Sequence, residues 1–347
     1  MPSVKSDVVD VVRFHPSDVT MGDEVYAGWR DAQLNDFPDQ TPLDRASIQS
    51  LLENPPHGWT GEFYAATVDG RIAGAVLLFL PGLDNTHLAH VEGWVHVGSR
   101  RQGVGRALYE RTLERLPELG RTTLIVRIHD RADIDPPAAG PRFAEAVGMS
   151  CAMTEVQRRQ YLDEVDDGVF AAMLADCWER AEGYEVVRWT DGADGPTPEE
   201  HVDDLSQLLV RLDTDAPHGD LRIEAREPDP EAVRALDHRN RAAGIRLVHT
   251  GVRHVASGRI VAWTTISTLP SDRGHGQQQI TVVDPGHRGR RLGTLAKLEN
   301  LAYARRVEPG LRLVETCNAD ENAHMIAINE TLGYRVHGRV HNFQKEI

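Results

Sequence analysis

The pattern of hydrophobic and polar positions predicts a series of helices and strands that occurs twice along the chain. The first series begins with a short strand and two helices, continues with three strands of β-branched and apolar residues, and ends with a helix, a strand and a short helix. Its segments are Val11–Phe14, Gly22–Leu34, Leu43–Leu52, Phe63–Val68, Ile72–Phe79, Leu88–Val97, Gly103–Leu116, Thr122–Ile128 and 141–149. The Asp-Gly pair at 69–70 indicates an antiparallel hairpin between two of the strands.

The second series follows the same order and adds a final strand. Its segments are Tyr184–Trp189, Val202–Leu212, Glu231–Ala243, Leu247–Val255, Arg259–Thr268, Gln278–Val283, Gly293–Arg305, Leu311–Thr316, Asn322–Leu332 and Tyr334–Phe343. Helices interspersed with short strands in this order are typical of an α+β fold. We expect each copy to be a mixed, mostly antiparallel sheet flanked by helices.

Two separate landmarks repeat at one spacing. The stretches "DGRIAGAVLLFLP" and "SGRIVAWTTISTLP" place Gly70 and Gly258 188 residues apart, and the same number separates Arg100 from Arg288. A spacing shared by two landmarks indicates two copies of one fold. Glycine, proline and aspartate near 190–200 mark the connection between them. We take residues 1–185 as an N-terminal domain and residues 186–347 as a C-terminal domain.

A glycine-arginine segment precedes the long helix of each copy, "HVGSRRQGVGRALYERT" in the first and "DPGHRGRRLGTLAKLEN" in the second. A strand that turns into a helix presents unpaired backbone N–H groups at the positive end of the helix dipole, which favours a phosphate. Gly103 and Gly105 allow a close approach, and Arg100, Arg101 and Arg106 add charge-assisted hydrogen bonds. A glycine-containing loop with solvated arginines is the alternative.

Two other kinds of phosphate loop do not match these letters. A Walker loop needs Gly-Lys followed by Ser or Thr, and neither copy has that sequence. A dinucleotide-binding loop needs a third glycine where Leu108 stands, in the first strand-helix unit of a chain.

The segment of the first copy resembles the acetyl-CoA motif of the GNAT superfamily of N-acetyltransferases, Arg/Gln-x-x-Gly-x-Gly/Ala. Arg100, Gly103 and Gly105 fill its three fixed positions. In the second copy Arg288 matches and Arg291 replaces the middle glycine. The downstream "TCNADENAHMIAINETLGY" resembles the family's strand, Asn-containing turn, helix and Gly-aromatic ending. The two-domain layout is similar to that of the double-domain mycothiol synthases.

The resemblance implies that acetyl-CoA is bound by these segments. The loop amides would hold the pyrophosphate, and the exposed backbone of the preceding strand would pair with the pantetheine arm. An amine would then attack the thioester directly, with the oxyanion held by a strand amide. The cofactor-binding residues implied are Val95, Val97, Arg100, Arg101, Gln102, Gly103, Val104, Gly105 and Arg106, and Val283, Arg288, Gly289, Arg290, Arg291, Leu292, Gly293, Thr294, Asn318 and Asn322.

The residues that move protons are less clearly marked. Family members often place a tyrosine four residues before the Gly-aromatic pair, where this chain has Ala144 and Asn329. The leaving thiolate would then be protonated by water or another residue, or one copy does no chemistry.

Glu92 and His90 share one strand face and are the candidate catalytic residues of the first copy. Alternation puts Val95 on the other face, so Glu92 reaches the thioester only if the strand carries a bulge. A solvated strand carboxylate is the alternative for Glu92. The matching strand of the second copy reads "GQQQITVV", and glutamine cannot act as a base, which favours the first copy for chemistry. In the mycothiol synthases the C-terminal copy is active, which favours the second.

Composition limits the partners. A formal net charge of −15 disfavours nucleic acid and anionic membranes and favours a small cationic acceptor. In the family that the chain resembles, the region after the first helix forms a wall of the acceptor site, so the resemblance implies that acidic residues there, among them Asp36 and Asp215, would hold such an amine. Solvated loop carboxylates are the alternative. No run approaches the roughly 20 apolar residues of a membrane span, and the N-terminus has no apolar core of signal-peptide length.

The cysteines and histidines indicate neither a disulfide framework nor a metal site. Three widely spaced cysteines fit no zinc pattern and suggest free thiols in the cytoplasm. His87, His90 and His96 could suggest a metal, but residues three apart on a strand, such as His87 and His90, point to opposite faces, so we expect no metal.

We expect an enzyme, an acetyl-CoA-dependent N-acetyltransferase that transfers the acetyl group directly to a small primary amine, as a monomer or homodimer. A non-catalytic acyl-CoA-binding protein and a transferase of another acyl group are the alternatives.

Overall fold

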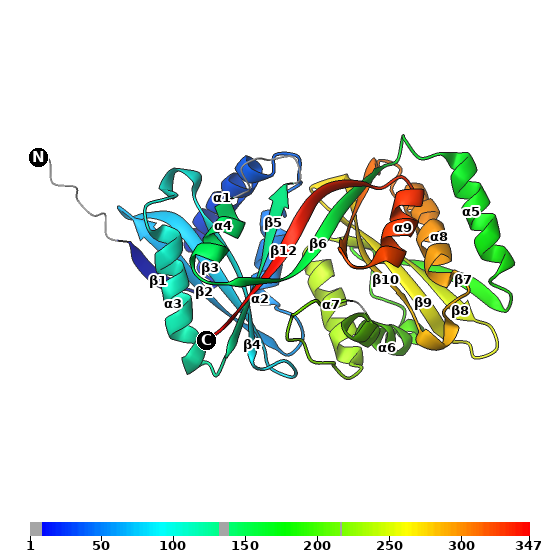
Figure 1. Cartoon of the computed structure of the whole chain (residues 1–347), viewed down its shortest axis with the longest axis horizontal. Coiled ribbons are helices and arrows are strands. Elements are labelled where there is room, and N and C mark those ends of the chain that lie inside the picture. Colours follow the sequence, from blue (N-terminus) through cyan, green and yellow to red (C-terminus); the bar gives the residue numbers. More distant parts are fainter. Residues whose placement is uncertain (1–8, 132–138, 216) are drawn as a thin grey trace, which may run out of the picture. The chain divides into compact units, whose positions relative to one another are not determined.

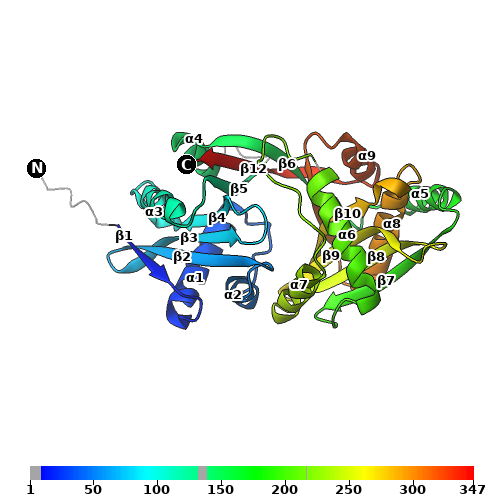
Figure 2. The same cartoon turned by 90° about the horizontal axis from the view of Figure 1, so that it is seen from below.

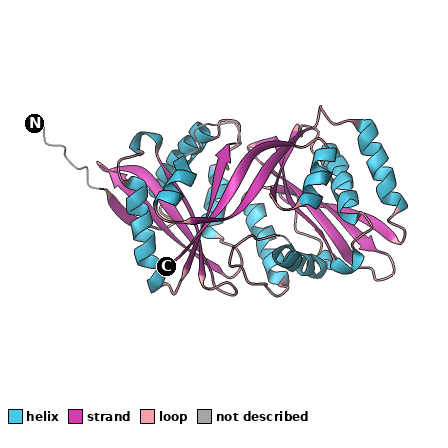
Figure 3. Cartoon of the chain, viewed as in Figure 1, coloured by secondary structure: helices cyan, strands magenta, loops and turns pink. Residues whose placement is uncertain are grey.

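A computed structural model describes residues 9–131, 139–215 and 217–347. The chain forms two compact units, each assembled from separate segments of the sequence (Figure 1). Unit 1 comprises Met1–Ile128, Ala138–Cys151 and Asn342–Ile347, and unit 2 comprises His129–Pro137 and Ala152–His341. The α+β class is confirmed, because helices flank a mixed sheet in each unit (Figure 3).

The strands of unit 1 follow the order β1-β2-β3-β4-β5. They are β1 (Asp10–Phe14), β2 (Trp59–Val68), β3 (Arg71–Pro81), β4 (Leu88–Val95) and β5 (Thr123–Arg131). β4 and β5 are parallel and the other neighbours are antiparallel. The predicted hairpin joins β2 to β3, where Asp69 and Gly70 have φ of 50° and 73°, the signs that a type I′ turn requires.

The helices of unit 1 cover both faces of its sheet (Figure 2). They are α1 (Val19–Asp36), α2 (Arg45–Glu53), α3 (Val104–Glu118) and α4 (Ala139–Ala146). Strand alternation sends Phe63 and Ala65 into the core under α1 and α2, and Tyr64 and Ala66 into the core under α3. Both faces of β2 are therefore buried.

The strands of unit 2 follow the order β6-β11-β10-β9-β8-β7, and β10 and β11 are its parallel pair. Its elements are β6 (Ser150–Tyr161), α5 (Asp167–Glu179), β7 (Tyr184–Gly192), α6 (Glu199–Asp215), α7 (Pro230–Ala242), β8 (Arg246–His254), β9 (Ile260–Leu269), β10 (Asp272–Val283), α8 (Leu292–Val307), β11 (Leu313–Ala319), α9 (Ala323–Thr331) and β12 (Arg335–Glu346). One core lies under α6 and α7, and a second contains the apolar face of α8. No helix in these described residues is long and apolar enough to cross a membrane.

The last strand of each copy belongs in part to the other unit. β6 ends the first copy, yet it pairs antiparallel with β11 of the second copy. The end of β12 and the residue after it, together Asn342–Ile347, lie in unit 1. There the Ile347 amide donates to the Thr122 carbonyl over 2.9 Å, and Lys345 Nζ donates to the Val147 carbonyl over 2.7 Å. The local sequence pattern does not predict this exchange, because it specifies strands and not their partners.

Candidate functional site

The loop before the long helix has the same backbone form in both copies. A 3₁₀ turn follows the strand, and two residues with positive φ precede the helix. In the first copy these residues are Arg101 (66°) and Gly103 (90°), and in the second they are Gly289 (81°) and Arg291 (57°). Each copy therefore has one glycine and one arginine at the two left-handed positions, in opposite order. Arg291 replaces the glycine without changing the form of the loop.

The helices that follow these loops begin without a side-chain cap. Gly103 and Arg291 are the N-caps of α3 and α8, and neither side chain bonds to the first turn. Helices α1, α2, α5, α7 and α9 begin instead at Asp or Asn residues that accept from a first-turn amide. Among the described atoms, none lies within 4 Å of a Cβ built on Gly103 or Gly289. The amides of both first turns are thus suited to an anion.

Arg100 and Arg288 connect the loop to the end of the first long helix of their copy. Arg100 donates two hydrogen bonds of 2.8 Å to Asp36 at the end of α1, and its Nε donates to the Val95 carbonyl over 3.3 Å. Arg288 pairs with Asp215 at the end of α6, and its Nε donates to the Val283 carbonyl over 3.2 Å. Asp36 and Asp215 are therefore paired, not solvated as the alternative expectation had it.

The other loop side chains point to several partners. Gln102 Nε2 donates to the Gly98 carbonyl over 2.8 Å, Arg290 lies over the Tyr184 ring at 5.9 Å, and Arg291 pairs with Asp176 of α5. Val97, Arg101 and Arg106 are exposed, Gly293 and Gly105 lie in the first helical turn, and Asn322 caps α9. Val104, Leu292 and Thr294 are buried, so they offer a ligand their backbone amides.

β4 does not carry the bulge that a role for Glu92 requires. It pairs with β3 in unbroken register from Val95 opposite Gly74 to His90 opposite Phe79. Trp94 packs in the core under α1 and α2, and Val95 packs in the core under α3. Since His90 and Glu92 alternate with Val95, they lie on the face of Trp94.

His90 and Glu92 differ in their surroundings. The His90 ring lies 5.0 Å from the Trp59 ring, and burial lowers the pKa of His90 to about 4, so the ring is neutral at pH 7. Glu92 is exposed. Desolvation raises the pKa of its carboxyl, and the charge of Arg127 opposes the rise.

The bulge lies instead in β10 of the second copy. Gln278 is opposite Ile266 and Ile280 is opposite Thr265, so Gln279 is an extra residue in β10. Gln278 Nε2 donates to Thr264 Oγ1 and to the Thr265 carbonyl, both over 2.8 Å. Gln278, one of the glutamines that cannot act as bases, thus bonds to the neighbouring strand β9 beside the bulge.

A pocket opens where the two parallel strands of unit 2 diverge. β10 pairs with β11 through residues 275–278 opposite 313–316, and both strands continue beyond that point. The pocket has a volume of about 300 Å³. Its lining comes from β6, the segment after α6, the bulge of β10, α8, the end of β11 and the start of α9, and includes Glu155, His218, Gln279, Lys297, Asn318 and Asn322.

The sequence pattern did not point to Lys297 of α8, nor to Glu155 and His218 of the same pocket. The Lys297 side chain is 3% exposed, and its Nζ donates to Asn329 Oδ1 over 2.6 Å. Asn329 Nδ2 donates in turn to Asn318 Oδ1 over 2.7 Å, and the Tyr334 ring centre lies 5.2 Å from Nζ. Burial lowers the pKa of Lys297 to about 7. A lysine at a core-facing helix position was the signal that could have revealed it.

The first copy has a different arrangement at the matching place. Tyr109 stands 188 residues before Lys297, and its hydroxyl donates to the Val147 carbonyl over 3.2 Å. Phe143 of α4 lies 3.5 Å from a Cβ built on Gly105. At Gly293, the matching position, Val283 and Thr281 are the described neighbours within 4 Å.

Comparisons with known proteins agree on one family. Residues 23–139 match the model described as the acetyltransferase (GNAT) family. The mycothiol acetyltransferase of Geodermatophilus obscurus is 28% identical over 310 residues, which cover 85% of each chain. A solved tandem GNAT protein from the clavulanic acid biosynthesis pathway is 30% identical, with a TM-score of 0.78 over 98% of both chains. A GCN5-related N-acetyltransferase from Sphaerobacter thermophilus, 16% identical, shares the fold with a TM-score of 0.62 over 97% of this chain and 95% of that one.

Proposed function

The chain belongs to the GNAT family of acetyltransferases, and on this premise we propose that it transfers the acetyl group of acetyl-CoA to a small primary amine in the pocket of unit 2. The tandem layout and the acyltransferase class predicted from the sequence are confirmed. The bulge of β10 beside the pocket between β10 and β11 is the observation that carries the assignment to the second copy.

The residues around this pocket fit acetyl-CoA. The first-turn amides of α8, within Arg290 to Thr294, would hold the pyrophosphate, because no side chain caps them and the space at Gly289 is open. The backbone of β10 beyond Gln278 has no partner on the β11 side among the described strands, so it can pair with the amides of an extended pantetheine arm. Acetyl-CoA supplies the activated acyl group.

The acceptor would occupy the remainder of the same pocket. A volume of about 300 Å³ suits a small molecule, and a Glu155 carboxylate in the wall favours a cationic amine. Glu155 and His218 are the groups of this lining that we propose for removal of the amine proton. Glu92 and His90 stay the prediction for the first copy.

A matched pair of variants tests which copy does the chemistry. Gly293→Glu and Gly105→Glu each place a carboxylate in the first turn of the loop helix, where it repels a phosphate. Thiol release from acetyl-CoA is measured against a panel of small amines, with melting temperatures as the control for folding. We expect Gly293→Glu to reduce turnover at least 100-fold and Gly105→Glu to change it less than threefold.

A large loss of turnover in Gly105→Glu and a small one in Gly293→Glu would assign the chemistry to the first copy. Glu92→Gln and His90→Gln would then test the base predicted there. Tight binding of acetyl-CoA without thiol release for any amine would overturn the proposed reaction. If thiol were released only from longer acyl-CoA donors, the protein would still be an acyltransferase, but the transferred group would not be acetyl.

A further inference from the structure

Lys297 is a rare residue in an unusual place. The chain has only three lysines, Lys5, Lys297 and Lys345, although lysine and arginine together number 38. Arginine stays protonated in proteins, whereas lysine can lose its proton when it is buried. Within the part of the chain that the structure describes, no carboxylate forms an ion pair with Lys297. A buried ammonium without a counter-ion costs stability, which is typical of a functional group.

Lys297 donates a hydrogen bond to an amide oxygen, which does not take the proton from Nζ. Asn329 directs its amide oxygen to Nζ because its amide nitrogen donates to Asn318. An amide oxygen accepts a hydrogen bond but does not take up a proton near pH 7. Asn318 and Lys297 both line the pocket, and Asn329 holds Nζ by a hydrogen bond.

We propose that Lys297 is the acid that protonates the departing thiolate of coenzyme A. The inference depends on the proposed function. It names a proton donor for the thiolate in a chain that has Asn329 where family members often have a tyrosine. A bond forms between the amine nitrogen and the acetyl carbonyl carbon, and the carbon–sulfur bond breaks with its electron pair on sulfur. Nζ gives one proton to that sulfur and becomes neutral. The amine loses its proton to a base or water in the pocket, and Nζ regains one from solvent.

The groups that face Lys297 allow its ammonium group to lose a proton. Asn329 and Asn318 are neutral, and Tyr334 presents its ring face to Nζ, so none of these three residues holds the ammonium by an opposite formal charge. Glu155, His218 and Cys317 are the titratable groups elsewhere in the pocket lining. Burial brings the pKa of Lys297 to about 7, where an acid can both give and regain a proton at neutral pH.

Three variants test the proposal. Lys297→Met keeps most of the length of the side chain and removes the ammonium group, and Lys297→Arg keeps a positive charge that does not dissociate. Tyr109→Phe changes the matching position of the first copy and is the control. We expect both Lys297 variants to lower kcat about 100-fold or more, with little change in the KM or Kd of acetyl-CoA, and Tyr109→Phe to have no effect.

A second measurement does not depend on turnover. In protein labelled with ¹⁵N at lysine Nζ, three signals are expected, and the one lost in Lys297→Met should titrate near pH 7. Asn329→Asp places a carboxylate beside Nζ and should raise that pKa. Since the acid must be protonated, the fall of kcat at high pH should move upward with it.

The outcomes separate this inference from the proposed function. A wild-type protein without turnover would overturn the function itself. Normal wild-type turnover with less than a threefold loss in folded Lys297→Met would overturn the inference alone. The inference would also be overturned if Asn329→Asp raised the pKa of Lys297 and left the pH profile of kcat unchanged. This measurement is available even if Lys297→Met does not fold.

Discussion

Both terminal nitrogens of Arg100 donate to the two carboxylate oxygens of Asp36, each over 2.8 Å, and the pair joins the end of α1 to the loop that precedes α3. The pair of Arg288 with Asp215 repeats this connection in the second copy. The two acidic partners are 179 residues apart and the two arginines 188. The connection has therefore been kept although the segments between its partners differ in length.

Arg100→Lys should loosen the loop, because an ammonium cannot form the two parallel bonds. The pair is partly exposed, so we expect a cost of about 1 kcal/mol in the free energy of unfolding. Hydrogen–deuterium exchange at residues 101–106 should become faster. Arg305→Lys, at an exposed pair with Asp167 of 3.6 Å, is the control and should change neither quantity. Unchanged exchange in Arg100→Lys would show that the pair does not hold the loop.

Replacing Gly289, the first left-handed residue of the second loop, by alanine should destabilise the protein. Gly289 has φ of 81°, and a Cβ there is strained although nothing lies within 4 Å. Gly289→Ala should cost about 1 kcal/mol, measured by urea unfolding. Gly310→Ala is the control, since it also has open space but no positive φ, and it should be neutral. Equal effects for the two variants would contradict the dihedral explanation.

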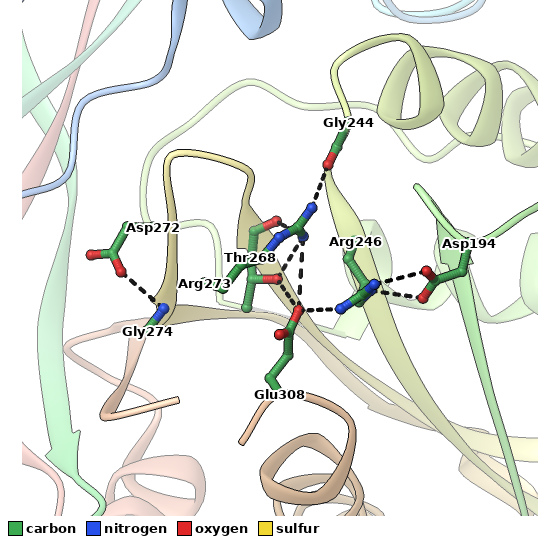
Figure 4. Close-up of polar contacts among 8 residues, drawn as sticks. All are labelled: Asp194, Gly244, Arg246, Thr268, Asp272, Arg273, Gly274 and Glu308. Carbon is green, nitrogen blue, oxygen red and sulfur yellow. Dashed lines mark hydrogen bonds and ion pairs between the residues drawn. The ribbon is translucent and has the colours of Figure 1, made fainter. Parts of the chain in front are cut away.

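A cluster of polar residues at one end of the unit 2 sheet depends on Glu308 (Figure 4). Its Oε1 accepts from Arg246 over 2.8 Å and from Thr268 over 3.1 Å, and Arg273 lies at 3.9 Å. Glu308 is buried, so Glu308→Gln leaves two guanidinium groups without a charge between them. We expect a loss of about 3 kcal/mol in the free energy of unfolding.

Asp194→Asn is the matched control for this cluster. Asp194 pairs with the same Arg246 over 2.8 Å, but its side chain is 30% exposed. Solvent screening should reduce its effect to about 1 kcal/mol or less. A loss in Glu308→Gln no larger than in Asp194→Asn would mean that burial does not strengthen the Glu308 contacts.

Because of Lys297, the free energy of unfolding should increase as the pH rises above 7. Its folded pKa is about 7, below the ordinary value of 10.5, so between these values the unfolded chain binds more protons than the folded one. Stability from this group therefore rises with pH across that range, and the full cost of the buried charge is present below pH 7. Lys297→Met should raise the melting temperature by several degrees at pH 6 and by much less at pH 10. An equal rise at both pH values would rule out a lowered pKa.

The sequence by itself determined the α+β class, the two copies, the hairpin at Asp69 and Gly70 and the loop before each long helix. These features depend on local patterns, because alternation, turn residues and helical spacing act over a few neighbouring positions. The family motif at Arg100, Gly103 and Gly105 added acetyl-CoA as the expected acyl donor.

Only the tertiary structure shows the features on which the proposal for the second copy depends. The bulge at Gln279 depends on the register between β10 and β9, which no residue of β10 specifies alone. Lys297 is buried and its Nζ is bonded to Asn329, 32 residues later. The exchange of β6 and β12 depends on pairing between segments more than 150 residues apart, such as Arg159 with Glu315. Contacts of this range form when the chain packs, so they leave no periodic signal in the sequence.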